Sequence, residues 1–223
     1  MFNHINGDLY AYAGNNPVKY TDPDGNTIIK SGTNMMNESQ STLGTGESPI
    51  SSVGCVFTSY VRMANALGAN ATLEEANKLA VKQDLFASGN LLTVEKGASL
   101  VNALLANAGI TDVSISYESS VYEDFSGNDN QFAAYKNHES SESEYFCNAR
   151  LYTSNADGTD YYGHTVSVDD NALASDRCDG TPTNIKIRDT STAGRSQLHG
   201  DISNRVNYLE RLDFFKINRT NKD

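Results

Sequence analysis

Apolar residues recur with the period of an α-helix in three successive segments of the first half of the chain. The second segment opens with Thr72 and Glu75, which have the spacing and residue types of a capping box. Gly68 and Gly109 follow the first and third segments, at the position where glycine commonly ends a helix. The pattern therefore predicts three amphipathic helices, which lie within residues 51–68, 73–86 and 93–109.

After Gly109 the apolar positions alternate with polar ones, which is the pattern of half-buried β-strands. Helices followed by strands are typical of an α+β fold, with N-terminal helices packed against an antiparallel sheet. The polar stretch at residues 119–144 is long for a connection, so it either covers a site or is disordered, and disorder is the preferred interpretation. A turn is expected at residues 169–171. The predicted strands are residues 112–117, 145–153, 164–168, 184–189 and 209–217.

The chain is acidic and polar, which limits the classes of partner. Its 223 residues are enough for one sizeable core, and the net charge of -11 disfavours nucleic acid and anionic membrane surfaces as partners. No segment approaches the roughly 20 apolar residues of a membrane span, and residues 1–10 lack the features of a signal peptide. The three cysteines and four scattered histidines include no Cys-x-x-Cys pair, so neither a metal site nor a cofactor is expected.

Cys55 stands at the start of the first predicted helix, directly after Gly54. Because Gly54 has no β-carbon, it allows the backbone to turn sharply into the helix. A helix N-terminus carries unpaired N–H groups and the positive end of the dipole, and both favour the thiolate. The thiolate is the nucleophilic form, so Cys55 is a candidate nucleophile; the alternative is a small buried hydrophobic residue.

Two further residues suited to thiol chemistry stand at the ends of two predicted strands. His164 begins one strand, and Asp189 ends the next one. If these strands are antiparallel neighbours, both side chains lie at the same edge of the sheet. A histidine can hold a cysteine as the thiolate and then protonate the leaving group, while an acid on its second ring nitrogen fixes the tautomer. We therefore expect Cys55, His164 and Asp189 to form a catalytic triad.

The remaining cysteines and the helix start add two expectations. The backbone N–H of Cys55 can supply half of an oxyanion hole, the donor set that stabilises the negative oxygen of a tetrahedral intermediate. Cys147 and Cys178 lie in or beside the strand-rich half and could form a disulfide in an oxidising compartment, leaving Cys55 as the free thiol. Two unconnected thiols are equally compatible with the sequence.

Residues 7–25, GDLYAYAGNNPVKYTDPDG, resemble the final motif of the core domain of Rhs (YD-repeat) proteins. In that family a large β-rich shell ends in such a motif and precedes a variable C-terminal domain that is very often a toxin. By this resemblance residues 1–26 are a remnant of the carrier shell. Residues 27–48 are rich in Ser, Thr, Asn and Gly and are expected to be a linker before a functional domain at 49–223. Asn26 stands where the family usually has a leucine at the release site, which leaves self-cleavage open.

The stretch from Ser51 to Asp189 resembles the papain-like cysteine peptidases of the bacteriocin-leader-processing type. The shared features are Gly-Cys before a helix, Leu-Gly at its end, a second helix, and much later Gly-His on one strand and Asp on the next. This resemblance implies a papain-like fold with Cys55 as nucleophile, His164 as base and Asp189 as the acid that orients the base.

Two positions depart from the pattern of that family. The family usually has an oxyanion-hole glutamine about six residues before the cysteine, where this chain has Pro49. Ser51, Ser52 or the more distant Gln40 could take its place. Val-Phe at residues 56–57 also replaces the small residue and Pro or Ala that often follow the nucleophile, which alters the shape of the pocket without touching the triad.

Together the resemblances imply a thiol-dependent peptidase that is the toxin cargo of an Rhs-type carrier and is delivered with it into target cells. Its partners would be a protein or peptide substrate, the carrier shell and a cognate immunity protein. The same residues also fit a papain-superfamily amidase acting on peptidoglycan, or a deamidase acting on a side-chain amide. The departure at Pro49 keeps open a third interpretation, a catalytically inactive adhesion or interaction module.

Overall fold

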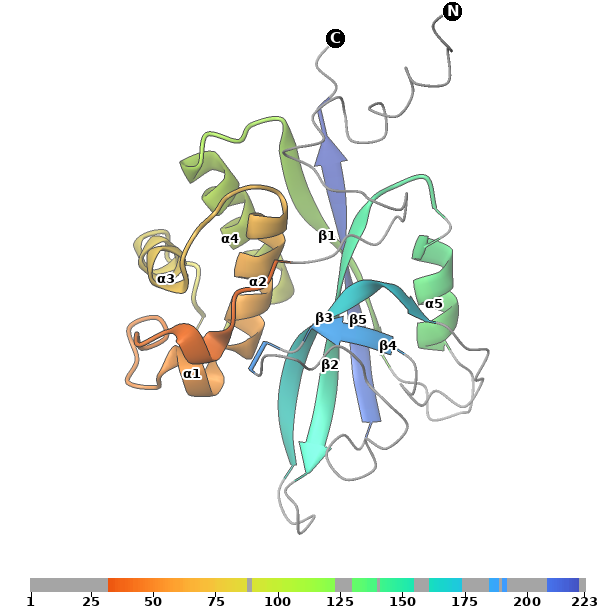
Figure 1. Ribbon diagram of the computed structural model, residues 1–223, viewed down its shortest axis with the longest axis horizontal. Helices are drawn as coiled ribbons and strands as arrows, with labels where there is room; N and C mark the ends of the chain where they lie inside the picture. The colour runs from red at the N-terminus through yellow and green to blue at the C-terminus, as the bar shows by residue number, and fades with distance from the viewer. Residues whose placement is uncertain are drawn as a thin grey trace, which may run out of the picture.

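The computed structural model shows a five-stranded antiparallel sheet with helices on both of its faces (Figure 1). The prediction of an α+β fold is therefore confirmed at the level of the fold class. The Rhs-like motif at residues 7–25 lies outside the described residues. The structure describes residues 32–87, 90–122, 130–139, 141–154, 161–173, 185–188, 190–191 and 208–220.

All three helices predicted from the apolar pattern form. The capping box is present, because the Thr72 hydroxyl accepts the Glu75 N–H and the Glu75 carboxylate accepts the Thr72 N–H. Gly68 and Gly109 follow two of the helices with φ of 98° and 75°, the left-handed conformation that glycine adopts without strain. The helices before the first strand are η3 (Met36–Glu38), α1 (Ile50–Val53), α2 (Cys55–Ala66), α3 (Leu73–Lys82) and α4 (Val94–Asn107).

The strands form one sheet in the order β1-β5-β2-β3-β4, and every neighbouring pair is antiparallel. The last strand therefore lies between the first two, so the sheet is complete only when the C-terminal segment is in place. The prediction of a turn at residues 169–171 is wrong, because β3 continues through these residues. The pairing of β3 with β4 becomes irregular there, after Val168. The strands are β1 (Val113–Tyr122), β2 (Tyr145–Ser154), β3 (Tyr161–Leu173), β4 (Ile185–Arg188) and β5 (Tyr208–Arg219).

The alternation of side chains along β5 produces two separate apolar clusters, one on each face of the sheet. Phe215 packs with α2 and α4, where its ring meets that of Tyr60 edge-on at 5.6 Å. Phe214 points to the other face and stacks on His138 of α5 (Asn130–Glu139) at 3.8 Å. The expectation of disorder at residues 119–144 is therefore wrong for α5, because packing on the sheet stabilises a helix that its own sequence does not mark.

The segment at residues 27–48, expected to be a linker, is part of the folded body from Gly32 onwards. Met36 and Leu43 are buried in the core with the helices. The side chain of Asn77 in α3 accepts the N–H of Gly44 and donates to the carbonyl of Thr42, at 2.8 and 2.9 Å. These hydrogen bonds satisfy the backbone of a polar segment, so the change in composition near residue 49 does not coincide with a change in packing.

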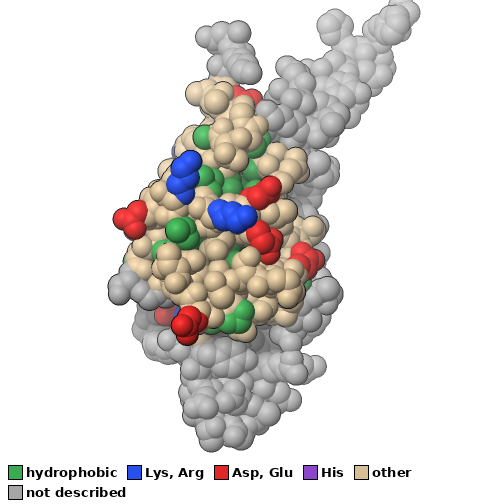
Figure 2. All heavy atoms as spheres, turned by 90° about the vertical axis from the view of Figure 1, so that its left-hand side faces the viewer, with side chains coloured by type: hydrophobic (Ala, Val, Ile, Leu, Met, Phe, Trp, Pro, Cys, Tyr) green, Lys and Arg blue, Asp and Glu red, His purple; other side chains and the backbone are tan. Residues whose placement is uncertain are grey.

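Figure 2 shows the face that α1–α4 present to solvent. Charged side chains of both signs are scattered over it, and hydrophobic side chains appear only as small separate patches. No helix in the described part of the chain combines the length and the hydrophobicity needed to cross a bilayer.

Candidate functional site

Cys55 is the first residue of α2, and its side chain is buried, with 9% exposure. The short helix α1 leads into it through Gly54. A β-carbon on Gly54 would lie 2.6 Å from the carbonyl oxygen of Ile50, closer than atoms can pack. The backbone at Gly54 has an ordinary φ of -84°. Glycine is therefore required here by the close approach of α1, rather than by the sharp turn that the sequence suggested.

The structure brings Cys55 and His164 together. The half-buried imidazole of His164, near the start of β3, is hydrogen-bonded to the Cys55 thiol, and the backbone N–H of Thr165 donates to the same sulfur. Helix α2 is held on the sheet beside this contact by Asn148 of β2, whose amide donates to the Ser59 hydroxyl at 3.0 Å. The first residue of the helix is thus placed against the strand that carries the histidine.

The surroundings of Cys55 lower the pKa of its thiol. Burial disfavours the charged thiolate and by itself raises the pKa, but several interactions outweigh it. In order of size, these are the hydrogen bond to His164, the charge of that imidazole, the N–H of Thr165 and the positive charge of Arg150. These interactions favour the thiolate, the nucleophilic form of a cysteine, relative to an ordinary thiol.

Cys147 provides a contrast within the same chain. It lies in β2 on the α5 side, with 2% exposure, and its thiol donates to the carbonyl of Asn148 at 3.8 Å. Burial and the negative charge of Asp213 raise its pKa well above the ordinary value. Cys147 is a free thiol, and Cys178, its expected disulfide partner, lies outside the described residues. The surroundings therefore shift the pKa values of Cys147 and Cys55 in opposite directions.

The predicted antiparallel pairing of the strands that carry His164 and Asp189 is present. Ser167 of β3 lies opposite Arg188 of β4, and the next pair continues in the same register. Asp189 itself lies outside the described residues, so its expected role as the orienting acid stays a prediction.

The chain next to the catalytic candidates is fixed by hydrogen bonds around Thr190. The Thr190 hydroxyl donates to the carbonyl of Thr165 at 2.9 Å, and the Thr190 carbonyl accepts the N–H of Met36 at 2.7 Å. Both backbone polar groups of Thr165 are thereby engaged, one by Cys55 and one by Thr190. The segment before α1, which the sequence marked as a linker, thus supports the strand that holds His164.

The candidates for the second oxyanion-hole donor are Ser51, Ser52 and Gln40. Ser51 and Ser52 are in α1, in the turn directly before Cys55, with Ser51 half-buried and Ser52 exposed. Pro49 caps α1, and its carbonyl accepts the N–H of Ser52 at 3.0 Å. Gln40 is exposed, and its backbone N–H donates to the Glu74 carboxylate of α3. Of these residues, the serines of α1 are nearest to Cys55 in the chain.

Arg150 belongs to the site but was not identified from the sequence. In β2 it lies opposite Thr165 of β3, where its Nη1 donates to the threonine hydroxyl at 3.3 Å. Its Nε is 3.4 Å from a carboxylate oxygen of Glu210. The alternation of β2 could have shown that Arg150 shares a face with Asn148, but only the pairing of β2 with β3 places it beside Thr165 and Cys55.

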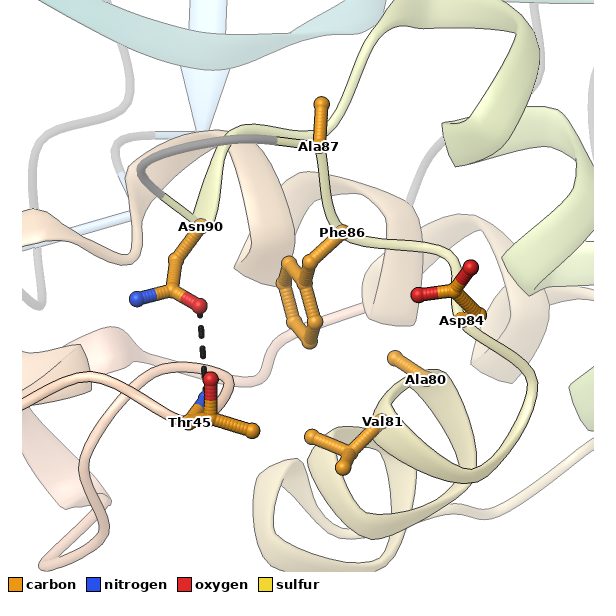
Figure 3. A pocket seen from close by; sticks show the side chains of 7 residues that line it. All are labelled: Thr45, Ala80, Val81, Asp84, Phe86, Ala87 and Asn90. Carbon is orange, nitrogen blue, oxygen red and sulfur yellow. Dashed lines mark hydrogen bonds between the residues drawn. The ribbon is translucent and has the colours of Figure 1, made fainter.

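A separate pocket of about 280 Å³ lies between α3 and the loop that follows it (Figure 3). The Asn90 side chain closes one side by accepting the N–H of Thr45 at 3.2 Å. Its lining contains one carboxylate, Asp84, and neither cysteine nor histidine. The pocket therefore does not supply the chemistry found around Cys55. Its lining residues are Thr45, Ala80, Val81, Asp84, Phe86, Ala87 and Asn90.

Within the described residues, no group of three or more His, Cys, Asp or Glu side chains is arranged to hold a metal ion. No protein-family profile matches the chain, and no curated protein matches it either. The geometry around Cys55 is therefore the basis for assigning a function.

Proposed function

We propose that the chain is a thiol-dependent peptidase of the papain-like type, and that it is the toxin cargo of an Rhs-type carrier. The observation that supports the peptidase is the hydrogen bond between the Cys55 thiol and His164, at the start of a helix packed on an antiparallel sheet. The resemblance of residues 7–25 supports the carrier.

In the proposed reaction the Cys55 thiolate attacks the carbonyl carbon of a peptide bond, and the carbonyl oxygen becomes an oxyanion. His164 protonates the amine, which leaves as the C–N bond breaks and a thioester forms. Water, deprotonated by His164, then attacks the thioester, releasing the acid and restoring the thiol. The backbone N–H of Cys55 and a serine of α1 are the proposed donors to the oxyanion. Asp189 is the proposed acceptor from the second imidazole nitrogen.

Alkylation with iodoacetamide tests the activated thiol without a known substrate. Reaction at each cysteine is followed by peptide mass spectrometry between pH 5 and pH 10, with Cys147 as the internal control. We expect Cys55 to react with a midpoint below about 8.5, the ordinary thiol pKa, and Cys147 to stay unmodified in the folded protein. A midpoint at or above the ordinary value for Cys55 would remove the basis for the enzyme.

Hydrolysis assays then identify the bond that is cut. The protein and its Cys55→Ala variant are incubated with a panel of unfolded proteins, with purified peptidoglycan sacculi and with glutamine-containing peptides. We expect new peptide termini from the proteins, dependent on Cys55. Release of muropeptides alone, or of ammonia alone, would replace the peptidase by an amidase or a deamidase.

A further inference from the structure

We propose that Arg150 forms a carboxylate-binding subsite beside Cys55, so that the preferred substrate carries a carboxylate close to the scissile amide. The inference deepens the proposed peptidase function and rests on it. It concerns substrate choice, which no motif in the sequence indicates.

The guanidinium of Arg150 lies flat against Gly163, the residue directly before His164. A β-carbon on Gly163 would lie 2.1 Å from Nη2 and 2.5 Å from Cζ of Arg150, so any side chain there would displace the guanidinium. The missing β-carbon therefore provides the space in which the cation sits. This gives a physical reason for the glycine of the Gly-His pair that is separate from backbone flexibility.

The position of Arg150 in the sheet is fixed by register. Arg150 lies between Thr165 of β3 and Arg211 of β5, in a row of residues that are paired across the strands and therefore project from one face. The row continues to Tyr122 of β1, over which the Arg211 guanidinium lies at 5.7 Å from the ring centre. The backbone N–H of Thr165 donates to Cys55, so the end of this row lies next to the Cys55 sulfur, and Arg150 is the first cation along it.

The hydrogen-bonding groups of Arg150 are only partly used. Nε is 3.4 Å from Glu210, and Nη1 donates to Thr165. Within the described residues, Nη2, the nitrogen closest to Gly163, makes no hydrogen bond. The side chain is 27% exposed, so a ligand can reach it. A guanidinium with a free N–H edge matches a carboxylate, whereas a neutral amide gains much less from it.

Charged groups of β5 face Arg150. Glu210 and Asp213 of β5 are negative, and Arg211 of the same strand is positive. Asp213 is itself paired with Arg211 at 2.9 Å. Glu210 contacts Arg150 through Nε, from the β5 side, whereas Nη2 lies toward Gly163. A carboxylate bound there would lie near the sulfur without displacing an existing ion pair.

The test compares an anionic and a neutral reagent at the same sulfur. Iodoacetate and iodoacetamide both react when the thiolate displaces iodide, so a change in the thiolate fraction cancels in the ratio of their rates. We expect Arg150→Gln to lower the ratio of iodoacetate to iodoacetamide rates at Cys55 by roughly three- to tenfold, an effect that shrinks at high salt. Gly163→Ala, which keeps the charge but displaces it, should lower the ratio in the same direction.

Arg211→Gln is the matched control, because Arg211 has a similar exposure of 28% and lies one strand further from Cys55. An unchanged ratio in Arg150→Gln, or an equal fall in Arg211→Gln, would overturn the subsite. Peptides that differ only as Asp against Asn, or as a terminal acid against a terminal amide, then distinguish an acidic side chain from a chain terminus. If Cys55 behaves as an ordinary thiol toward both reagents, the proposed function fails, while the ratio still reports on Arg150.

Discussion

The Cys55 thiol is hydrogen-bonded to the His164 imidazole, although the first opens helix α2 and the second lies near the start of strand β3. Helices α3 and α4, strand β1, helix α5 and strand β2 lie between them in the chain. The contact forms because α2 packs on the sheet with its first residue against β3, and it is the basis for proposing Cys55 as nucleophile and His164 as base.

Removing His164 should raise the pKa of Cys55. The imidazole supplies the two largest interactions that lower this pKa, and without them the effect of burial, which raises it, dominates. In His164→Gln we expect the alkylation midpoint of Cys55 to move from below about 8.5 to above it, and hydrolysis to fall by at least about a hundredfold. The control is His138→Gln, because His138 lies on α5 and stacks on Phe214. An unchanged midpoint in the first variant would contradict the pairing.

Placing a methyl group on Gly54 should disturb the nucleophile. The new β-carbon would lie 2.6 Å from both the carbonyl oxygen and the Cγ2 atom of Ile50, so the junction of α1 and α2 must shift and take Cys55 away from Thr165. We expect Gly54→Ala to lose about 1–3 kcal/mol of unfolding free energy and to slow the alkylation of Cys55 at least about tenfold at pH 7.

Gly109→Ala separates these two effects. A β-carbon there meets nothing within 4 Å, but φ is 75°, so the substitution should cost about 1 kcal/mol of backbone strain without changing the reactivity of Cys55. Equal slowing of alkylation in both glycine variants would show that general destabilisation, rather than the position of Cys55, controls the thiol.

Arg62 should hold the segment before α1 on the protein. Its side chain is 1% exposed, its Nε donates to the carbonyl of Asn34, and its Nη2 lies 2.8 Å from the sulfur of Met35. We expect Arg62→Met to lower the free energy of unfolding by about 2 kcal/mol and to expose residues 32–38 to limited proteolysis. The exposed Lys82→Met serves as control. Continued protection of the segment in the Arg62 variant would show that Arg62 does not hold it in place.

The stability of the fold should depend on the ionisation of Asp213. Burial raises the pKa of this carboxyl group above its ordinary value, despite the hydrogen bond from Ser120 and the charge of Arg211. Below pH 3.9, approximately its unfolded pKa, the group is neutral in both states; as pH rises through the higher folded pKa, the buried charge costs stability. We therefore expect Asp213→Asn to gain stability relative to the parent protein between pH 3.5 and pH 7 in urea unfolding.

The exposed Glu47→Gln serves as the control for this comparison, since it removes a carboxylate from the surface rather than from the buried position. A difference between Asp213→Asn and the parent that falls with rising pH would mean that the ion pair with Arg211 outweighs the cost of burial.

Several features were fixed by local sequence. The three main helices were predicted because their apolar residues share one face, and the Thr72–Glu75 box closes on itself within a single turn. The five strands were located because their side chains alternate, and Cys55 was placed at a helix start by the residues around it. Each of these depends on contacts within a few residues, which the order of residues specifies directly.

Other features appeared only when distant segments were brought together. Helix α5 lacks a clear apolar face and is stabilised where His138 and Tyr135 meet the sheet. The polar segment from Gly32 onwards packs because Asn77 and Arg62 satisfy its backbone. The local sequence does not show which distant residues these segments contact. Their polar composition alone therefore indicated disorder for one and a linker for the other.

The sequence by itself determined which residues could carry the chemistry, a cysteine at a helix start and a histidine at a strand start. Only the tertiary structure decided that they meet, and that Arg150 stands beside them with Gly163 making room for it. The reason is that periodicity reports which face a residue occupies within its own element, whereas the neighbour across strands depends on the order β1-β5-β2-β3-β4, which no local pattern encodes.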